Sequence, residues 1–317
     1  MKHHGSKDIA VLHINAIGDQ VLAWPAMRAL DRLFPGRIKL VLGAGMRSVF
    51  YRDVQLKTIF RARLHDRAAD ANPERILVVV EPLVRELGLC EIFIVLSDWC
   101  NESISAVVDG ARPRRSIGFG SSFGECVEVA SDVHMFDKIF AAVQCLDPSL
   151  VLEDFCGWPK FSPAAIGAAE RLKDKHLLPE EKLLFVHPET LPLKTWARAH
   201  YNDVLPKFLK ERREYRILVC TQQQFELGSH PRIHAISPHL ELAMALVGLS
   251  DCFLGVDSCF LHAADLYGLP GVALFGPTNP DIWGFRLSKT ARHISGGGSI
   301  ENLSEEEVLE ALLQVAP

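Results

Sequence analysis

The sequence has no apolar run that approaches the roughly 18 residues a helix needs to cross a bilayer. Residues 1–8 are polar, and no apolar stretch with a small-residue cleavage site follows them, so we expect no secretory signal. Together these absences predict a cytoplasmic protein without a transmembrane segment.

Motifs typical of zinc sites, dinucleotide sites and P-loops are also missing. None of the eight cysteines forms a CxxC pair, which favours buried free thiols over a zinc site or a disulfide framework. Neither a complete GxGxxG nor a Walker A sequence is present, and this disfavours an NAD-dependent oxidoreductase. No Asp-x-Asp follows a predicted strand, so we expect no bound divalent metal ion.

Neither sign of charge is in large excess. The chain carries 34 basic and 39 acidic residues, for a formal net charge of −5, which gives no reason to expect a nucleic-acid partner. Its 48% apolar and 23% charged residues are ordinary for a globular protein. With 317 residues the chain exceeds the size at which one core keeps growing, so we expect two domains of about 150 residues.

What the sequence does contain is an alternation of short apolar runs and amphipathic stretches, which predicts strands and helices in turn. The apolar runs that we interpret as strands or buried segments are 9–14, 38–42, 76–80, 92–96, 112–119, 183–187, 217–221, 252–256 and 272–275. The stretches with helical spacing are 20–34, 132–146, 162–176, 200–210, 240–249, 259–267 and 304–315. The pattern predicts an α/β fold with parallel sheets, helices on both faces and a domain boundary within 155–165.

Open α/β sheets bind ligands beyond the carboxyl ends of their strands, so the turns at those ends are the first candidates for a site. In the first half, Gly18 permits a tight turn close to a ligand, and Asp19 stands where the next helix begins. From the residues alone, a helix cap explains Asp19 as well as a role in chemistry does.

Three turns in the second half carry groups suited to phosphate. Thr190 offers a hydroxyl and Lys194 a positive charge, although an exposed loop lysine would look the same. Asp257 and Ser258 stand between a strand and a helix, where free backbone N–H groups suit a diphosphate and Asp257 could act as a cap. The Gly/Pro turn at 275–280 would close over the same ligand or serve only as a structural turn.

In order and spacing these four turns resemble those of glycosyltransferase family 9, the heptosyltransferases, and the resemblance extends from Ile9 to Leu312. The segments that carry it are 18–19, 25–30 (Pro-Ala-x-Arg-Ala-Leu), 115–119 (Arg-x-Ile-Gly-Phe), 134–138 (His-x-x-x-acid-base), 185–188, 194–196, 257–258, 262–264 and 275–278. Among these, the stretches from 257 to 278 are the most specific.

The resemblance implies a GT-B fold, in which two facing Rossmann-like domains enclose a cleft. The first domain, 1–160, would bind the acceptor and the second, 161–303, the nucleotide sugar, with the C-terminal helix 304–317 packing back onto the first. The implied reaction is an inverting transfer, most often of a heptose from ADP-heptose, to a glycan, glycolipid or small-molecule acceptor. No metal or other cofactor is expected, and peripheral contact with a membrane stays open.

Carried over by position, the resemblance makes Asp19 the base that deprotonates the acceptor hydroxyl. Thr190 and Lys194 would hold phosphates. Ser258 would bind the diphosphate, and Glu226 falls where the family places a ribose-binding acid. The remaining donor-site residues would be Asp257, Cys259, His262 and Thr278. The acceptor or sugar contacts would be His13, Asn15, Gly18 and His134.

Three departures from the family pattern bear on the donor. His13 stands where the family usually has a basic residue, Cys259 where it has Gly, and Gln222-Gln223 where it has Gly-Gly. They leave open a transferase that uses another nucleotide sugar in a specialised pathway, and a sugar-nucleotide-binding protein without transfer. The second is disfavoured because a pure binder needs no base.

Some of these side chains have an ordinary structural explanation. His134 is explained equally well as a sugar contact and as a helix cap. Trp24, Trp196 and Trp283 could stack on a sugar or base, but core packing is favoured for Trp24 and Trp196.

Overall fold

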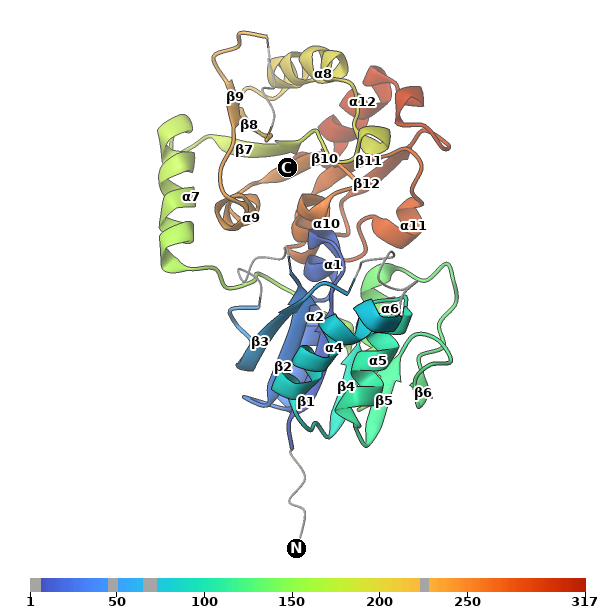
Figure 1. The fold of residues 1–317 in the computed structure, drawn as a ribbon. Coiled ribbons are helices and arrows are strands. Elements are labelled where there is room, and N and C mark those ends of the chain that lie inside the picture. The colour runs from blue at the N-terminus through green and yellow to red at the C-terminus, as the bar shows by residue number, and fades with distance from the viewer. Residues whose placement is uncertain (1–6, 45–50, 65–72, 223–227) are drawn as a thin grey trace, which may run out of the picture. The chain divides into compact units, whose positions relative to one another are not determined.

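The structure is a computed structural model that describes residues 7–44, 51–64, 73–222 and 228–317. The chain divides into two compact units, Met1–Pro159 and Lys160–Pro317. Each unit contains a parallel six-stranded sheet with helices packed against it, as Figure 1 shows. No helix in the described part of the chain is long and apolar enough to cross a membrane.

In the first unit the strands lie in the order β3-β2-β1-β4-β5-β6. They are β1 (Ile9–His13), β2 (Ile38–Gly43), β3 (Leu56–Ala62), β4 (Ile92–Val95), β5 (Arg115–Gly118) and β6 (Glu125–Cys126). The helices are α1 (Ile17–Leu22), α2 (Trp24–Leu33), α4 (Pro73–Leu87), α5 (Glu102–Ala111) and α6 (Met135–Gln144), followed by the 3-10 helix η1 (Leu152–Phe155). Helices α4 and α5 pack together over the face of the sheet that presents Ala10 and Leu12.

The second sheet repeats the order of the first. Read from its β9 edge it is β9-β8-β7-β10-β11-β12, so both sheets place their strands third, second, first, fourth, fifth and sixth. The strands are β7 (Lys182–His187), β8 (Tyr215–Cys220), β9 (Ile233–Ile236), β10 (Cys252–Val256), β11 (Gly271–Phe275) and β12 (Arg292–Ser295). The helices are α7 (Pro163–His176), α8 (Arg198–Glu211), α9 (Leu240–Gly248), α10 (Cys259–Leu266), α11 (Pro280–Trp283) and α12 (Glu305–Val315), with 3-10 helices η2 (Pro192–Lys194) and η3 (Ile300–Asn302).

The C-terminal helix α12 belongs to the second unit. It packs against α8 and β11, and its Val308 and Leu312 lie in the same apolar core as Leu254 and Phe208. The expectation that 304–317 packs onto the first domain is therefore corrected, because the apolar stripe of α12 is buried against its own unit.

Two other sequence interpretations change. Residues 76–80 are part of helix α4, in which Ile76, Val80, Leu83 and Leu87 are buried while Val78 is 74% exposed. Spacings of four, three and four are those of one helical face, not of a strand. The predicted helix 20–34 is two helices, α1 and α2, that meet at the cap residue 23.

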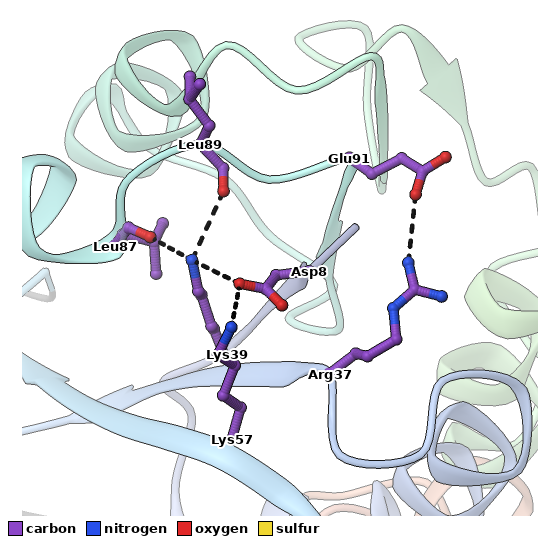
Figure 2. Close-up of polar contacts among 7 residues, drawn as sticks. All are labelled: Asp8, Arg37, Lys39, Lys57, Leu87, Leu89 and Glu91. Carbon is purple, nitrogen blue, oxygen red and sulfur yellow. Dashed lines mark hydrogen bonds and ion pairs between the residues drawn. The ribbon is translucent and has the colours of Figure 1, made fainter. Parts of the chain in front are cut away.

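The amino end of the first sheet is held by a cluster of charges, shown in Figure 2. Lys39 donates from Nζ to the carbonyl oxygen of Leu87 at 2.7 Å, and it lies 3.1 Å from Oδ2 of Asp8. Lys57 reaches the same carboxylate oxygen at 2.7 Å. A lysine that binds the last carbonyls of a helix stabilises its C-terminus, so this cluster ties α4 to β1 and β2.

Arg28, the arginine of the Pro-Ala-x-Arg-Ala-Leu segment, binds the last residues of the first unit. Its two terminal nitrogens donate to the carbonyl oxygens of Phe155, Gly157 and Trp158 at 2.9 to 3.0 Å. Nε donates to Asp53 Oδ2 at 2.7 Å. The planar guanidinium has five donors, and it uses them to fasten the stretch that leads out of the unit onto α2.

We expect Arg28→Met to loosen this stretch, because three backbone carbonyls would lose the bonds from Arg28 and the largely buried Asp53 carboxylate would lose its ion-pair partner. Limited proteolysis should cut the variant faster than the wild type near residues 155–160. Arg37→Met is the matched control, since it removes an arginine whose pairing with Glu91 is half exposed. Equal cutting of the Arg28 variant and the wild type would show that other contacts hold the stretch.

Candidate active site

Both sheets have the same topological switch point, where the strand order reverses between neighbours. In the first unit it lies between β1 and β4, and in the second between β7 and β10. In open α/β sheets ligands bind beyond the carboxyl ends of the strands at such a point. Most of the residues singled out from the sequence follow three of these four strands, β1, β7 and β10.

In the second unit, Lys194, Asp257 and Thr278 form a connected cluster. Lys194 donates from Nζ to Asp257 Oδ2 at 2.6 Å, and Thr278 donates from Oγ1 to the same oxygen at 2.7 Å. Asp257 is buried, whereas the Lys194 side chain keeps 24% of its surface exposed. The turns after β7, β10 and β11 therefore meet at one carboxylate, with a cation beside it that an anionic ligand can reach.

Ser258 starts helix α10 but does not cap it with its side chain. Its Oγ is buried and has no hydrogen-bond partner within the described residues. The first backbone N–H groups of an α-helix lack intrahelical acceptors, and the helix dipole favours negative charge there. Next to it, burial raises the pKa of the Cys259 thiol to about 12, which disfavours the reactive thiolate.

Two buried histidines flank this region. His262, on α10, places Nε2 3.9 Å from Asp257 Oδ1, and its ring lies 6.3 Å from that of Trp283. His187, at the end of β7, packs its ring 4.5 Å from that of Phe260. Burial lowers the pKa of His187 to about 3, so this imidazole is neutral. His187 stood in a quoted segment, yet the sequence assigned it no role.

The other donor-site candidates are less closely connected. Thr190 is exposed, and its backbone N–H donates to Thr195 Oγ1 at 3.1 Å. Gln222, one of the departures from the family pattern, donates its backbone N–H to Glu189 after β7. Glu226 lies outside the described residues.

In the first unit, Asp19 is the third residue of α1 and is partly exposed. Its Oδ2 accepts a hydrogen bond from the backbone N–H of Ala16 at 3.1 Å, so the carboxylate does serve the start of this helix. Gly18 lies in the first turn of α1 and not in a left-handed turn, which corrects the tight turn expected there.

Three of the four expected acceptor contacts are buried. Asn15 Oδ1 accepts from Trp99 Nε1 at 2.9 Å, and His13 is fully buried and bonded to the backbone of Asp19. His134 is the N-cap of α6, where Nδ1 accepts from the N–H of Phe136 at 3.1 Å. Of the two explanations for His134, the structure shows the cap.

One charged pair near the first switch point was missed by sequence reasoning. Asp98 follows β4 and pairs with Lys138 of α6 at 3.0 Å, and its charge acts on His13. Like Asp257 after β10, Asp98 lies in the turn after a central strand. A search of all the turns after predicted strands would therefore have found it. Trp24 and Trp196 are buried core residues, as expected. All eight cysteines are free thiols, but only three of them are buried, namely Cys90, Cys220 and Cys252.

Within the described residues, no group of three or more His, Cys, Asp or Glu side chains is arranged to hold a metal ion. The polar groups that do gather are Lys194, Thr278 and Ser258, around the buried Asp257 carboxylate and the start of α10. Such donors bind and orient a negatively charged group without a proton-transfer role of their own.

The buried histidines should make the protein less stable in acid. Folding lowers the pKa of His13 to about 4 and of His187 to about 3, from about 6.5 in an unfolded chain. Between pH 6.5 and these values the unfolded state binds more protons, so stability falls as the pH falls. We expect Tm to drop from pH 7 to pH 5, and to drop less in His187→Phe. Equal drops in both proteins would contradict a buried neutral His187.

Two Rossmann-like units that share one strand order make up the GT-B fold. The sequence matches the family described as glycosyltransferase family 9 (heptosyltransferase) over residues 130–312, more than half of the chain. The chain therefore belongs to this family and is a glycosyltransferase, which confirms the resemblance found in the sequence. No curated protein matches it significantly.

Solved structures share the fold at low sequence identity. A glycosyltransferase family 9 protein from Veillonella parvula has a TM-score of 0.78 at 17% identity, covering 98% of both chains. E. coli ADP-heptose lps heptosyltransferase II has a TM-score of 0.67 at 17% identity, again over 98% of each chain. E. coli heptosyltransferase WaaC with ADP has a TM-score of 0.69 at 14% identity, covering 98% of this chain and all of that one.

Proposed function

We propose that this protein transfers a heptose from ADP-heptose to an acceptor hydroxyl, with inversion at the anomeric carbon and without a metal ion. The observation that carries the proposal is the Lys194–Asp257–Thr278 cluster beside the start of α10. It offers a cation, hydroxyl groups and backbone N–H groups at the place where open α/β sheets bind ligands. The donor assignment draws on the family and on relatives whose names include ADP-heptose.

In the proposed reaction, Asp19 takes the proton from the acceptor hydroxyl as its oxygen attacks the anomeric carbon. The bond from that carbon to the diphosphate breaks, and ADP leaves with the electron pair. Lys194 and the N–H groups at the start of α10 stabilise the charge that develops on the leaving diphosphate. The acceptor is a glycan, glycolipid or small molecule, and we place the reaction in the cytoplasm.

The test is a donor screen by native mass spectrometry. The protein is mixed with ADP-heptose and with ADP-, UDP-, GDP- and dTDP-sugars of other kinds, and retained ligands are measured. Retention of ADP-heptose above the others supports the proposal. Selective retention of another nucleotide sugar would show that this sugar is the donor. Cys259 and Gln222, which depart from the family pattern, leave room for that outcome. Binding without turnover towards any acceptor would favour a sugar-nucleotide-binding protein.

We expect transfer to continue unchanged in excess EDTA. Lys194 and the start of α10 already supply positive charge and donors for a diphosphate, so no divalent ion is required to offset it. The measurement is the initial rate with chelator and after adding back magnesium or manganese. A rate that vanishes with EDTA and returns with either metal would contradict metal independence.

A further inference from the structure

The turn that carries Asp19 is closed by a hydrogen bond from a buried histidine. Nε2 of His13 lies 2.9 Å from the backbone carbonyl oxygen of Asp19. A carbonyl oxygen only accepts, so Nε2 must carry the proton and the imidazole must be the Nε2–H tautomer. This bond joins the end of β1 to the first turn of α1 across six residues.

Two more buried side chains stand behind His13. Gln20 donates from Nε2 to the carbonyl oxygen of His13 at 3.0 Å. Tyr51 donates from its hydroxyl to Gln20, with 2.8 Å to the backbone oxygen and 3.1 Å to Oε1. All three residues are at most 1% exposed. They form one chain of bonds that ends at the backbone of Asp19.

The backbone of Tyr51 also has an unfavourable conformation, which the surrounding structure has to stabilise. Its φ of 62° lies in the left-handed region, which residues other than glycine rarely adopt. Its ring packs edge-on against Trp24, 5.4 Å between centroids. Such conformations persist where the surroundings over-determine them, and they gather at functional sites.

His13 acts in this chain as a donor and not as a charge. Burial lowers its pKa to about 4, against the opposing effects of its bond to Asp19 and of the Asp98 charge. Nδ1 is buried and has no hydrogen-bond partner among the described residues, so a second proton would find no acceptor there. The neutral ring therefore holds the Asp19 backbone without altering the charge of its carboxylate.

We propose that Tyr51, Gln20 and His13 are positioning residues that hold Asp19 in place to deprotonate the acceptor, an inference that rests on the proposed function. The bonds from Tyr51 to Gln20 and from Gln20 to His13 are buried, and the bond from His13 to Asp19 is partly buried. Loss of one member therefore removes a support of the Asp19 turn and lets it shift. A catalytic group displaced by about 1 Å can lose on the order of 10²-fold in rate. Donor binding, which we assign to the second unit, should not depend on this chain.

The kinetic test is a double-mutant cycle between Tyr51→Phe and His13→Leu. Each single variant should lower kcat, by up to about 10²-fold for His13→Leu, with the donor KM unchanged. The double variant should be little worse than His13→Leu, because both act through one chain. His13→Gln, whose amide can donate to the same carbonyl, should recover part of the rate. Tyr215→Phe is the matched control, since it deletes a hydroxyl that bonds the carbonyl of Pro317 in the second unit.

A tautomer measurement tests the same inference without activity. In ¹⁵N-edited NMR of the wild type, the resonances that His13→Gln removes should show a neutral Nε2–H ring that stays neutral to about pH 4. An Nδ1–H tautomer, independent effects in the cycle, or a raised donor KM in place of a lowered kcat would overturn the inference. Failure of the proposed function would give a different result. The wild type would then transfer no sugar, although NMR would still show the Nε2–H tautomer of His13.

Discussion

Asp19→Asn should slow sugar transfer by at least about two orders of magnitude, while donor binding and Tm stay close to those of the wild type. General-base assistance contributes about 10²–10⁴-fold, and an amide cannot take the proton. The amide oxygen can still accept the hydrogen bond from Ala16, so the start of α1 should keep its support. The measurements are single-turnover rates, donor affinity by calorimetry and thermal melting.

Glu102→Gln is the control for this experiment. It removes a carboxylate from the first turn of another helix of the same unit, α5, and should change neither rate nor affinity. Near-normal turnover in Asp19→Asn would mean that Asp19 only supports its helix. The base would then have to be sought elsewhere, and the two histidines among the expected acceptor contacts, His13 and His134, would be the next candidates. Both are buried, and burial lowers the pKa of His13 to about 4, so His13 would be a weak base.

The fold was predictable from the sequence where strands are central and buried. β1, β4, β7, β10 and β11 are continuous apolar runs because helices cover both faces of a parallel sheet. The four strands that the pattern missed, β3, β6, β9 and β12, are the four edges of the two sheets. Edge strands are half exposed and carry charges such as Lys57 and Arg292, so they show no apolar run.

The sequence was enough to predict which residues form the candidate site, but not which of them contact one another. Reading the ends of strands found Asp19, Lys194, Asp257 and Thr278, because topology places such ends together. That Lys194 and Thr278 share one oxygen of Asp257 depends on turn geometry that spacing does not encode. The bond from Tyr51 to Gln20 spans 31 residues and joins a loop to a helix, so no local pattern could reveal it.

Lys194→Met should weaken donor binding roughly 10- to 100-fold. A charge-assisted hydrogen bond contributes about 1.5–3 kcal/mol, and each 1.4 kcal/mol is tenfold in affinity. The same change should lower Tm, because the buried Asp257 carboxylate would lose its lysine partner and keep only the Thr278 hydroxyl and the His262 ring beside it. Donor affinity by calorimetry and thermal melting measure the two effects separately.

The double variant Lys194→Met/Asp257→Asn separates stability from binding. Neutralising the stranded carboxylate should restore much of the lost Tm but not the lost affinity, since no cation returns to meet the diphosphate. Lys138→Met breaks a comparable pair with Asp98 in the first unit and should leave donor affinity unchanged. If Lys194→Met binds its donor as tightly as the wild type, Lys194 serves only as the partner of Asp257. The anion would then be held by Ser258 and the N–H groups of α10 alone, and Ser258→Ala should produce the loss that Lys194→Met did not.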